Sequence, residues 1–274
     1  MNYKIIADSS ADLLGSEAIV SVPLKIITAD NEYVDDADLN VQSMLADLEA
    51  YKGKSGSSCP NAGDYLDAFG NAENVFCVTI TSGLSGSCNA ACAAAESYCE
   101  AHPDRRAYVV DSLSAGPEVA LLVLKLEELI ADGKDFDTVV TEIEAYKKTT
   151  HLCFALESLH NLANNGRVSS LVAKMAGILG IRVIGKASDE GVLDVFAKVR
   201  GAAKVVPTVA EHMVEQGYQG GRVRIHHCEN EPLAESLRDA LVGRFPHAQV
   251  EIQATRGLCS FYAERGGMLI GYEG

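Results

Sequence analysis

The chain has 274 residues, of which 23 are basic and 38 acidic, so its formal net charge is −15. Such a charge would repel nucleic-acid phosphates and anionic lipid headgroups, and nucleic-acid binding is therefore disfavoured. The composition, 47% hydrophobic and 22% charged, is that of a globular protein, and no apolar run reaches the roughly 18 residues that span a bilayer.

In chain order, the first half alternates short strands with amphipathic helices. Strands are expected at residues 3–7, 20–27, 75–80 and 107–110, where β-rich runs are bounded by turn-forming residues. Apolar residues at three- and four-residue steps predict helices at 117–131 and 135–147. The alternation predicts a largely parallel sheet with helices on both faces. Because the first strand starts without the basic and apolar segments of a secretory leader, we expect a cytoplasmic location.

Beyond about residue 150 the pattern changes. Strands are expected at 152–156, 181–184, 193–198, 222–227, 249–254 and 268–272, and helices at 171–179, 203–216 and 232–244. We therefore predict an α/β protein of two lobes. The N-terminal lobe, 1–150, would hold a mostly parallel sheet flanked by helices, and the C-terminal lobe, 151–274, would be α+β.

The cysteines and histidines do not indicate a metal site. The eight cysteines include no C-x-x-C pair, so reduced and mostly buried thiols are expected. Cys88, Cys92 and Cys99 would share a helix face, where the intervening alanines favour close packing over metal binding. His226 and His227 are adjacent in a predicted strand and would point to opposite faces of the sheet.

Residues 80–87, which are rich in glycine and hydroxyl groups, follow a predicted strand and open an alanine-rich helix. Hydroxyls and backbone N–H groups at a helix N-terminus could hold an anion. The alternative is a capped turn without a ligand, because serine is a preferred N-cap residue. The spacing matches neither the dinucleotide-binding G-x-G-x-x-G motif nor a P-loop, so nucleotide binding is disfavoured.

Two further polar features leave alternatives open. Residues 55–60 form a second hydroxyl-rich cluster before a helix expected near Gly63. Asp8 ends the first strand, at the sheet edge where open α/β folds bind ligands, and is a candidate general base, although an Asx turn or helix cap is favoured. A hydrolase or transferase with Ser85 as nucleophile is kept as an alternative, and it is disfavoured because no G-x-S-x-G elbow is present.

The motifs, in their order along the chain, resemble those of the DegV family. In the first half they are residues 6–13 (Ile-Ala-Asp-Ser-Ser-Ala-Asp-Leu), 22–24 (Val-Pro-Leu), 57–60 (Ser-Ser-Cys-Pro), 80–87 and 110–112 (Val-Asp-Ser). In the second half they are 159–162 (Leu-His-Asn-Leu), 165–169 (Asn-Gly-Arg-Val-Ser) and 198–201 (Lys-Val-Arg-Gly). The matches span nearly the whole chain.

The resemblance implies a two-domain α/β protein that buries one long-chain fatty acid in a tunnel. It implies a carrier rather than an enzyme, which presents the carboxylate to a separate bacterial fatty-acid kinase that forms acyl-phosphate. It implies no cofactor and no metal, and its partners would be the fatty acid and the kinase, without nucleic acid or membrane insertion. A regulatory, lipid-sensing interaction protein is a further alternative.

Carried over by motif, the resemblance also implies site residues. The carboxylate would be bound by Ser57, Ser85 and the Gly86 N–H, with Ser58, Ser82 and Tyr262 as secondary contacts, and the kinase would contact Arg200 and Lys198. The chain departs from the family near Ala263, where a histidine is usual and where Tyr262 or Ser260 could substitute. Burial in a dry tunnel contributes roughly 0.8 kcal/mol for each methylene, so the affinity would come from the tail. Hydroxyl and backbone donors are expected to offset the desolvation of the carboxylate without a buried counter-charge.

Overall fold

The computed structural model of the protein describes residues 3–15, 18–168 and 180–274. The helix expected at 171–179, and Ser169 of the Asn-Gly-Arg-Val-Ser motif, lie outside the described residues. None of the helices within the described ranges is long and apolar enough to cross a membrane.

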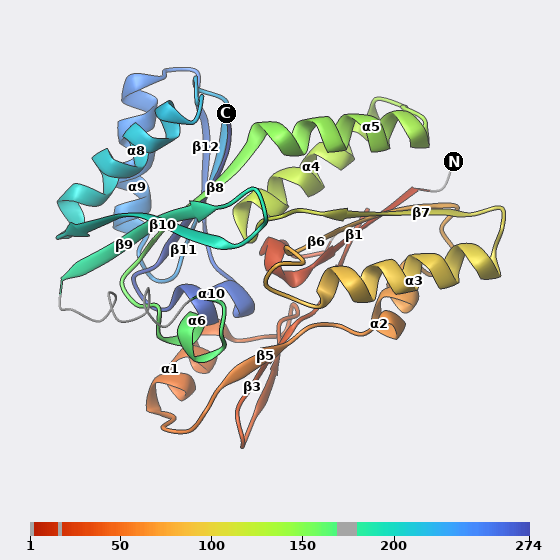
Figure 1. Ribbon diagram of the computed structural model, residues 1–274, viewed down its shortest axis with the longest axis horizontal. Helices are drawn as coiled ribbons and strands as arrows, with labels where there is room; N and C mark the ends of the chain where they lie inside the picture. The colour runs from red at the N-terminus through yellow and green to blue at the C-terminus, as the bar shows by residue number, and fades with distance from the viewer. Residues whose placement is uncertain (1–2, 16–17, 169–179) are drawn as a thin grey trace.

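Four parallel strands form the first sheet, in the order β2–β1–β6–β7. They are β1 (Tyr3–Asp8), β2 (Ile19–Val22), β6 (Asn74–Thr79) and β7 (Arg106–Asp111). Helices α2 (Ala62–Phe69) and α3 (Ser87–Ala101) cover one face, and α4 (Pro117–Ala131) and α5 (Phe136–Tyr146) cover the other (Figure 1). In β1, Ile5 packs in the core formed with α4 and α5, whereas the next residue, Ile6, packs in the core formed with α2 and α3. The predicted parallel sheet is confirmed.

The single strand expected at 20–27 is wrong. Pro23 interrupts it, because proline has no N–H for the sheet ladder, and the chain passes from β2 into β3 (Lys25–Ile27) of another sheet. This small antiparallel sheet has the order β4–β3–β5, with β4 (Glu32–Val34) and β5 (Gly56–Ser58). Along the chain, α1 (Val41–Ala50) comes between β4 and β5. It begins where the Asn40 side chain accepts the Ser43 N–H.

Six strands form the second large sheet, in the order β10–β9–β8–β13–β11–β12. They are β8 (Thr150–Leu156), β9 (Ile181–Ala187), β10 (Leu193–Arg200), β11 (Arg222–His227), β12 (Gln249–Ala254) and β13 (Met268–Glu273). All neighbours are antiparallel except β11 and β12. Helices α8 (Val205–Glu215) and α9 (Glu231–Arg244) pack on one face, and the short α6 (His160–Asn164) and α10 (Gly257–Ala263) lie with α1 against the other.

The two large sheets lie side by side with α4 packed against both of them (Figure 1). The strands of the first sheet precede Thr150, and those of the second begin at or after it. However, α4 contacts β8, β11 and β13, and α10 contacts β3 and the 3-10 helix η1 (Ser9–Ala11). We keep the division into 1–150 and 151–274 as a proposal, because each of these helices contacts elements on the other side of it.

Candidate functional site

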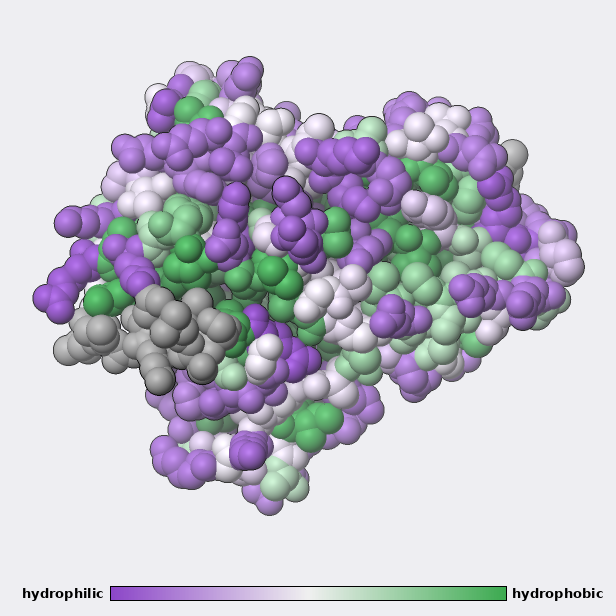
Figure 2. Space-filling model, in the orientation of Figure 1, coloured by the Kyte–Doolittle hydropathy of each residue, from purple (hydrophilic) through white to green (hydrophobic). Residues whose placement is uncertain are grey.

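A cavity of about 280 Å³ lies where the two large sheets meet the small one. Most of its wall is apolar, and residues from both halves of the chain contribute to it. The apolar lining includes Leu24, Ile80, Leu84, Ala115, Leu152, Phe154, Leu156, Leu162, Leu193, Leu258 and Leu269. Figure 2 shows hydrophobic residues gathered in the hollow at the middle of the face that Figure 1 presents.

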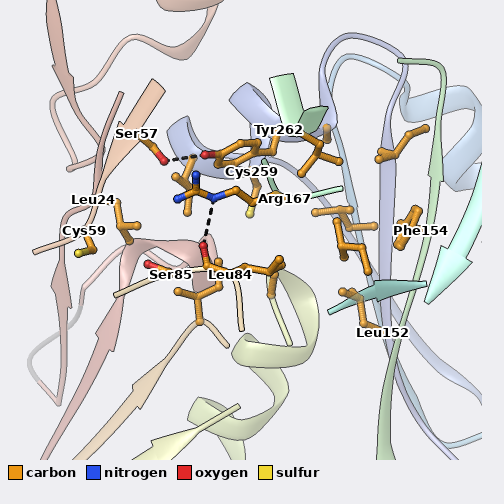
Figure 3. Close-up of a pocket in the computed structure, with 18 of the residues that line it drawn as sticks. Leu24, Ser57, Cys59, Leu84, Ser85, Leu152, Phe154, Arg167, Cys259 and Tyr262 are labelled. Atoms are coloured by element: carbon orange, nitrogen blue, oxygen red, sulfur yellow. Dashed lines mark hydrogen bonds between the residues drawn. The ribbon is translucent and has the colours of Figure 1, made fainter. Parts of the chain in front are cut away.

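The hydroxyl of Ser57 lies at the polar end of this cavity. Ser57 belongs to β5, whose pairing with β3 sets it opposite Ile26. Its Oγ lies 2.7 Å from the Oη of Tyr262, which α10 brings from the other half of the chain (Figure 3). Either hydroxyl can donate in this pair, so the second proton stays available for an anion.

Ser85 and Gly86 line the same cavity from the turn that opens α3. The Ser87 N–H donates to Ser85 Oγ at 3.2 Å, so the Ser85 hydroxyl keeps its own proton to donate. A Cβ on Gly86 would lie 3.2 Å from the Sγ of Cys59, so this turn lies directly against the segment that follows Ser57. The structure thus brings the two predicted hydroxyl clusters to one cavity.

Arg167 was not predicted as a site residue, and it lines the polar end. Its Nε donates to the Leu84 carbonyl at 3.1 Å, and its Nη1 donates to the Asn165 carbonyl. In Figure 3 its guanidinium lies between Ser57 and Tyr262 on one side and the Leu84–Ser85 turn on the other. A half-buried cation therefore lies at the polar end, where the sequence predicted hydroxyl and backbone donors without a buried counter-charge. The signal was present in the sequence, as an arginine directly after an Asn-Gly turn.

Two buried carboxylates hold the start of α10, the helix that carries Tyr262. Asp35 accepts the Gly257 and Leu258 N–H groups at 2.8 and 2.9 Å, and burial raises the pKa of Asp35 to about 6. Asp12 accepts the Arg256 N–H at 2.8 Å. Its other oxygen lies 2.9 Å from His226 Nδ1. These contacts fix α10 against η1 and β11.

Asp8 has the structural role that the sequence favoured. Its side chain caps η1 by accepting the Ser10 N–H, and it also accepts the Ile80 N–H at 2.9 Å and the Ser87 hydroxyl at 2.6 Å. Burial raises its pKa. Since Asp8 ties the end of β1 to both ends of residues 80–87, it shapes the turn that carries Ser85.

The remaining predicted residues lie in different places. Ser58 lines the cavity, whereas Ser82 is exposed outside the described lining and its N–H donates to Asp111. Lys198 and Arg200 are exposed on β10, the edge strand of the second sheet, away from the lining. Ala263, which stands near a family histidine position, is buried in the cavity wall.

The cysteine and histidine predictions agree with the structure in part: Cys88 is buried, but Cys92 is exposed and Cys99 half-buried, so the packed face expected for these three is wrong. Five of the eight cysteines are buried, and all eight are free thiols. His226 points to Asp12, while His227 Nδ1 accepts the Asn230 N–H. Within the described ranges, no group of three or more His, Cys, Asp or Glu side chains could hold a metal ion.

Comparisons with known proteins agree with this architecture. The family model described as "Uncharacterised protein, DegV family" matches residues 2–273. A DegV domain-containing protein of Streptococcus pneumoniae is 47% identical over 279 residues, covering 100% of this chain and 99% of the relative. A similar protein of Streptococcus gordonii is 41% identical, with the same coverage.

Two solved structures are similar over nearly their full length. The Fatty Acid Kinase (Fak) B3 protein of Streptococcus pneumoniae, loaded with linoleic acid, has a TM-score of 0.98 at 46% identity, covering 100% of this chain and 99% of that one. A DegV family protein of Eubacterium eligens, loaded with heptadecanoic acid, has a TM-score of 0.96 at 41% identity, covering 99% of each chain.

Proposed function

The chain belongs to the DegV family, and on that premise we propose that it binds one long-chain fatty acid in the cavity and presents the carboxylate to a fatty-acid kinase. The relatives that hold linoleic and heptadecanoic acid support this proposal, because they are at least 41% identical and share the fold over nearly their whole length.

One observation carries the proposal: a long apolar wall that ends at hydroxyls and a single guanidinium, among the described lining residues. Each methylene buried against an apolar wall contributes roughly 0.8 kcal/mol of binding free energy, so the tail supplies most of the affinity. A carboxylate withdrawn from water needs charged or hydrogen-bonding partners to offset its desolvation. The polar end offers both kinds.

We assign the carboxylate to Ser57, Ser85 and the Gly86 N–H, and we add Arg167 as the counter-charge. Tyr262 acts through Ser57, because one hydroxyl of the pair can donate a hydrogen bond to the ligand while the other hydroxyl donates within the pair. Ser58 is a neighbouring contact, whereas Ser82 has no direct role in this assignment because it lies outside the described lining.

The kinase would approach across β10, where Arg200 and Lys198 project side chains from an otherwise acidic protein. Exposed cations of this kind orient a partner of opposite charge. A kinase that uses ATP also places the encounter in the cytoplasm. The alternative of a Ser85 nucleophile is disfavoured, because the described cavity lining contains no histidine or carboxylate that could act as its base.

A pair of variants tests both halves of the proposal. Protein purified from bacteria is denatured, and released fatty acid is measured by mass spectrometry; a second sample receives kinase and ATP, and acyl-phosphate is measured. Ser85→Ala should lose about tenfold in fatty-acid affinity, the rough value of one hydrogen bond to a charged group. Arg200→Ala should retain the acid but form less acyl-phosphate.

Each variant is the control for the other, and Ser82→Ala is a matched control for Ser85→Ala within the same turn. Repeated preparations without any fatty acid would refute the binding proposal. Normal phosphorylation of the Arg200→Ala protein would remove that residue from the kinase contact.

A further inference from the structure

A second chamber lies behind the apolar end of the cavity. It has a volume of about 440 Å³ and is lined largely by polar and titratable residues, among them Glu118, Lys147, Lys148, His151 and Asp189. Leu152 lines both the cavity and this chamber. In Figure 3, Leu152 and Phe154 lie on the side of the cavity opposite Ser57 and Cys59. Leu152 therefore stands where an acyl tail would end.

The strand β8 fixes the position of Leu152. Alternate side chains of a strand share a face, so Leu152, Phe154 and Leu156 all line the cavity, whereas Cys153 packs in the core beneath α8 and α9. The side chain is 3% exposed, and its backbone pairs with Gly271 of β13. It is a packed wall residue.

Two neighbouring segments complete this partition. Leu113 lines the second chamber and Ala115 lines the cavity, so the loop that contains them passes between the two spaces. A Cβ on Gly271 would lie 2.6 Å from the backbone of Pro117 and Glu118, so α4 begins in tight contact with β13. This tight packing leaves the partition little room to shift toward the second chamber.

The two sides of the partition differ in chemistry. On the cavity side a methylene gains the full benefit of an apolar wall. On the other side it would meet Glu118, whose carboxyl accepts hydrogen bonds from Ser114 and Thr150, and the lysines that follow α5. A tail that reached past Leu152 would desolvate these polar groups without pairing them.

We propose that Leu152 sets the upper limit of acyl chain length for this protein. This inference rests on the proposed function and adds to it the residue that selects among fatty acids. Leu152→Ala removes three carbon atoms from the end wall, which makes room for about two further methylenes. At roughly fourfold per methylene, the preference for an acid two carbons longer should rise by about fifteenfold.

The test is a competition among saturated fatty acids of even carbon number, mixed in equal amounts and offered to delipidated protein. Bound acids are identified by mass spectrometry. The Leu152→Ala protein should retain longer acids than the parent. Leu258→Ala is the matched control: it removes the same atoms from a buried leucine of the cavity wall that does not line the second chamber. It should leave the length limit unchanged.

Leu152→Phe provides the opposite change and should shift the limit toward shorter acids, so the inference can be tested even if the alanine variant does not fold. Identical length profiles for the parent and both Leu152 variants would overturn the role of Leu152, as would an equal shift in Leu258→Ala. Failure of the parent to bind any acid would instead reject the proposed function itself.

Discussion

Arg167 combines a charge with an almost fixed orientation. Two of its N–H groups bond to the Leu84 and Asn165 carbonyls, which leaves the other donors of the guanidinium directed at the polar end of the cavity. A guanidinium can form two parallel hydrogen bonds to one carboxylate. Its contribution should therefore depend on the charge of the ligand headgroup, and much less on the tail.

Replacing Arg167 with alanine should weaken fatty-acid binding by about tenfold or more, as expected for loss of hydrogen bonds between charged groups. The affinity for the fatty alcohol of equal length should fall much less, because the alcohol carries no charge. Calorimetric titration with both ligands measures the difference. Arg182→Ala, which breaks an ion pair with Glu157 outside the cavity, is the control. Equal losses for acid and alcohol would show that Arg167 merely supports the fold.

The sequence indicates Ser57 and Ser85 but not Arg167, for a physical reason. Ser85 lies in a local pattern, hydroxyl and glycine residues at the start of a helix, that has a meaning by itself, whereas Ser57 is indicated by the resemblance of its motif to the DegV family. The position of Arg167 depends on a contact with Leu84, which lies 83 residues away in the chain. The Asn-Gly turn before Arg167 is a local signal, but the contact of its side chain with Leu84 follows from packing of the whole fold.

Among the elements, the β9–β10 hairpin joins the second sheet directly to the Ser85 turn. Thr81 begins this turn, and Gly191 lies at the tip of the hairpin. The Oγ1 of Thr81 donates to the Gly191 carbonyl at 2.8 Å. Gly191 has φ +73°, and a Cβ there would lie 2.1 Å from Thr81 Oγ1. A glycine is required at this tip for both conformational and steric reasons.

Gly191→Ala should lower the free energy of unfolding and speed fatty-acid release, because the hairpin must lift from Thr81 to accept the methyl group. Gly133→Ala is the matched control: φ is +75° and no atom lies within 4 Å of the added Cβ. Both variants bear a backbone strain of about 1–2 kcal/mol, so the excess loss in Gly191→Ala reports the clash. Urea denaturation and ligand-release kinetics measure the two effects. Equal destabilisation of both proteins would contradict the proposed contact.

Strong periodicity predicted elements well, and its absence explains what was missed. Helix α4 has the predicted bounds, Pro117–Ala131, and so does β11, Arg222–His227. Helix α10 was not predicted, although it carries Tyr262. Six of its seven residues are buried, so it has no polar face and no amphipathic pattern to recognise.

For the whole molecule, Glu118 connects the two large sheets. It lies in the first turn of α4, and its carboxyl accepts the Ser114 hydroxyl at 2.5 Å and the Thr150 hydroxyl, at the start of β8, at 2.8 Å. Burial raises the pKa of Glu118 from its ordinary value of 4.5 to about 7. The folded protein therefore favours the neutral acid.

The sign of the pH effect follows from this shift. Between the two pKa values the folded state binds more protons than the unfolded state, so this group makes stability fall as pH rises from about 4.5 to about 7. The full loss is about 3 kcal/mol, at roughly 1.4 kcal/mol per pKa unit. Glu118→Gln removes the ionisation, so its stability should decline less between about pH 5 and about pH 8.

Urea denaturation of both proteins at the two pH values tests this prediction. At the higher pH the free energy of unfolding of the variant should rise relative to that of the parent. At the lower pH, where the parent carries the neutral acid, there should be no such rise. Asp35, whose pKa burial also raises, is present in both proteins, so its contribution cancels. Parallel pH profiles would contradict the role given to Glu118.

The cavity wall takes residues as far apart in the chain as Leu24 and Leu269. A ribosome therefore delivers the two sides of the wall at very different times, and β8 emerges well before β13, one of the two strands that pair with it. Until β13 has been synthesised, β8 lacks one of its two partner strands and the cavity wall lacks Leu269, so the apolar face of Leu152, Phe154 and Leu156 is not yet fully covered. The cavity wall is thus complete only once residue 269 has been synthesised, and a fatty acid that enters it then fills the last gap of a newly made core.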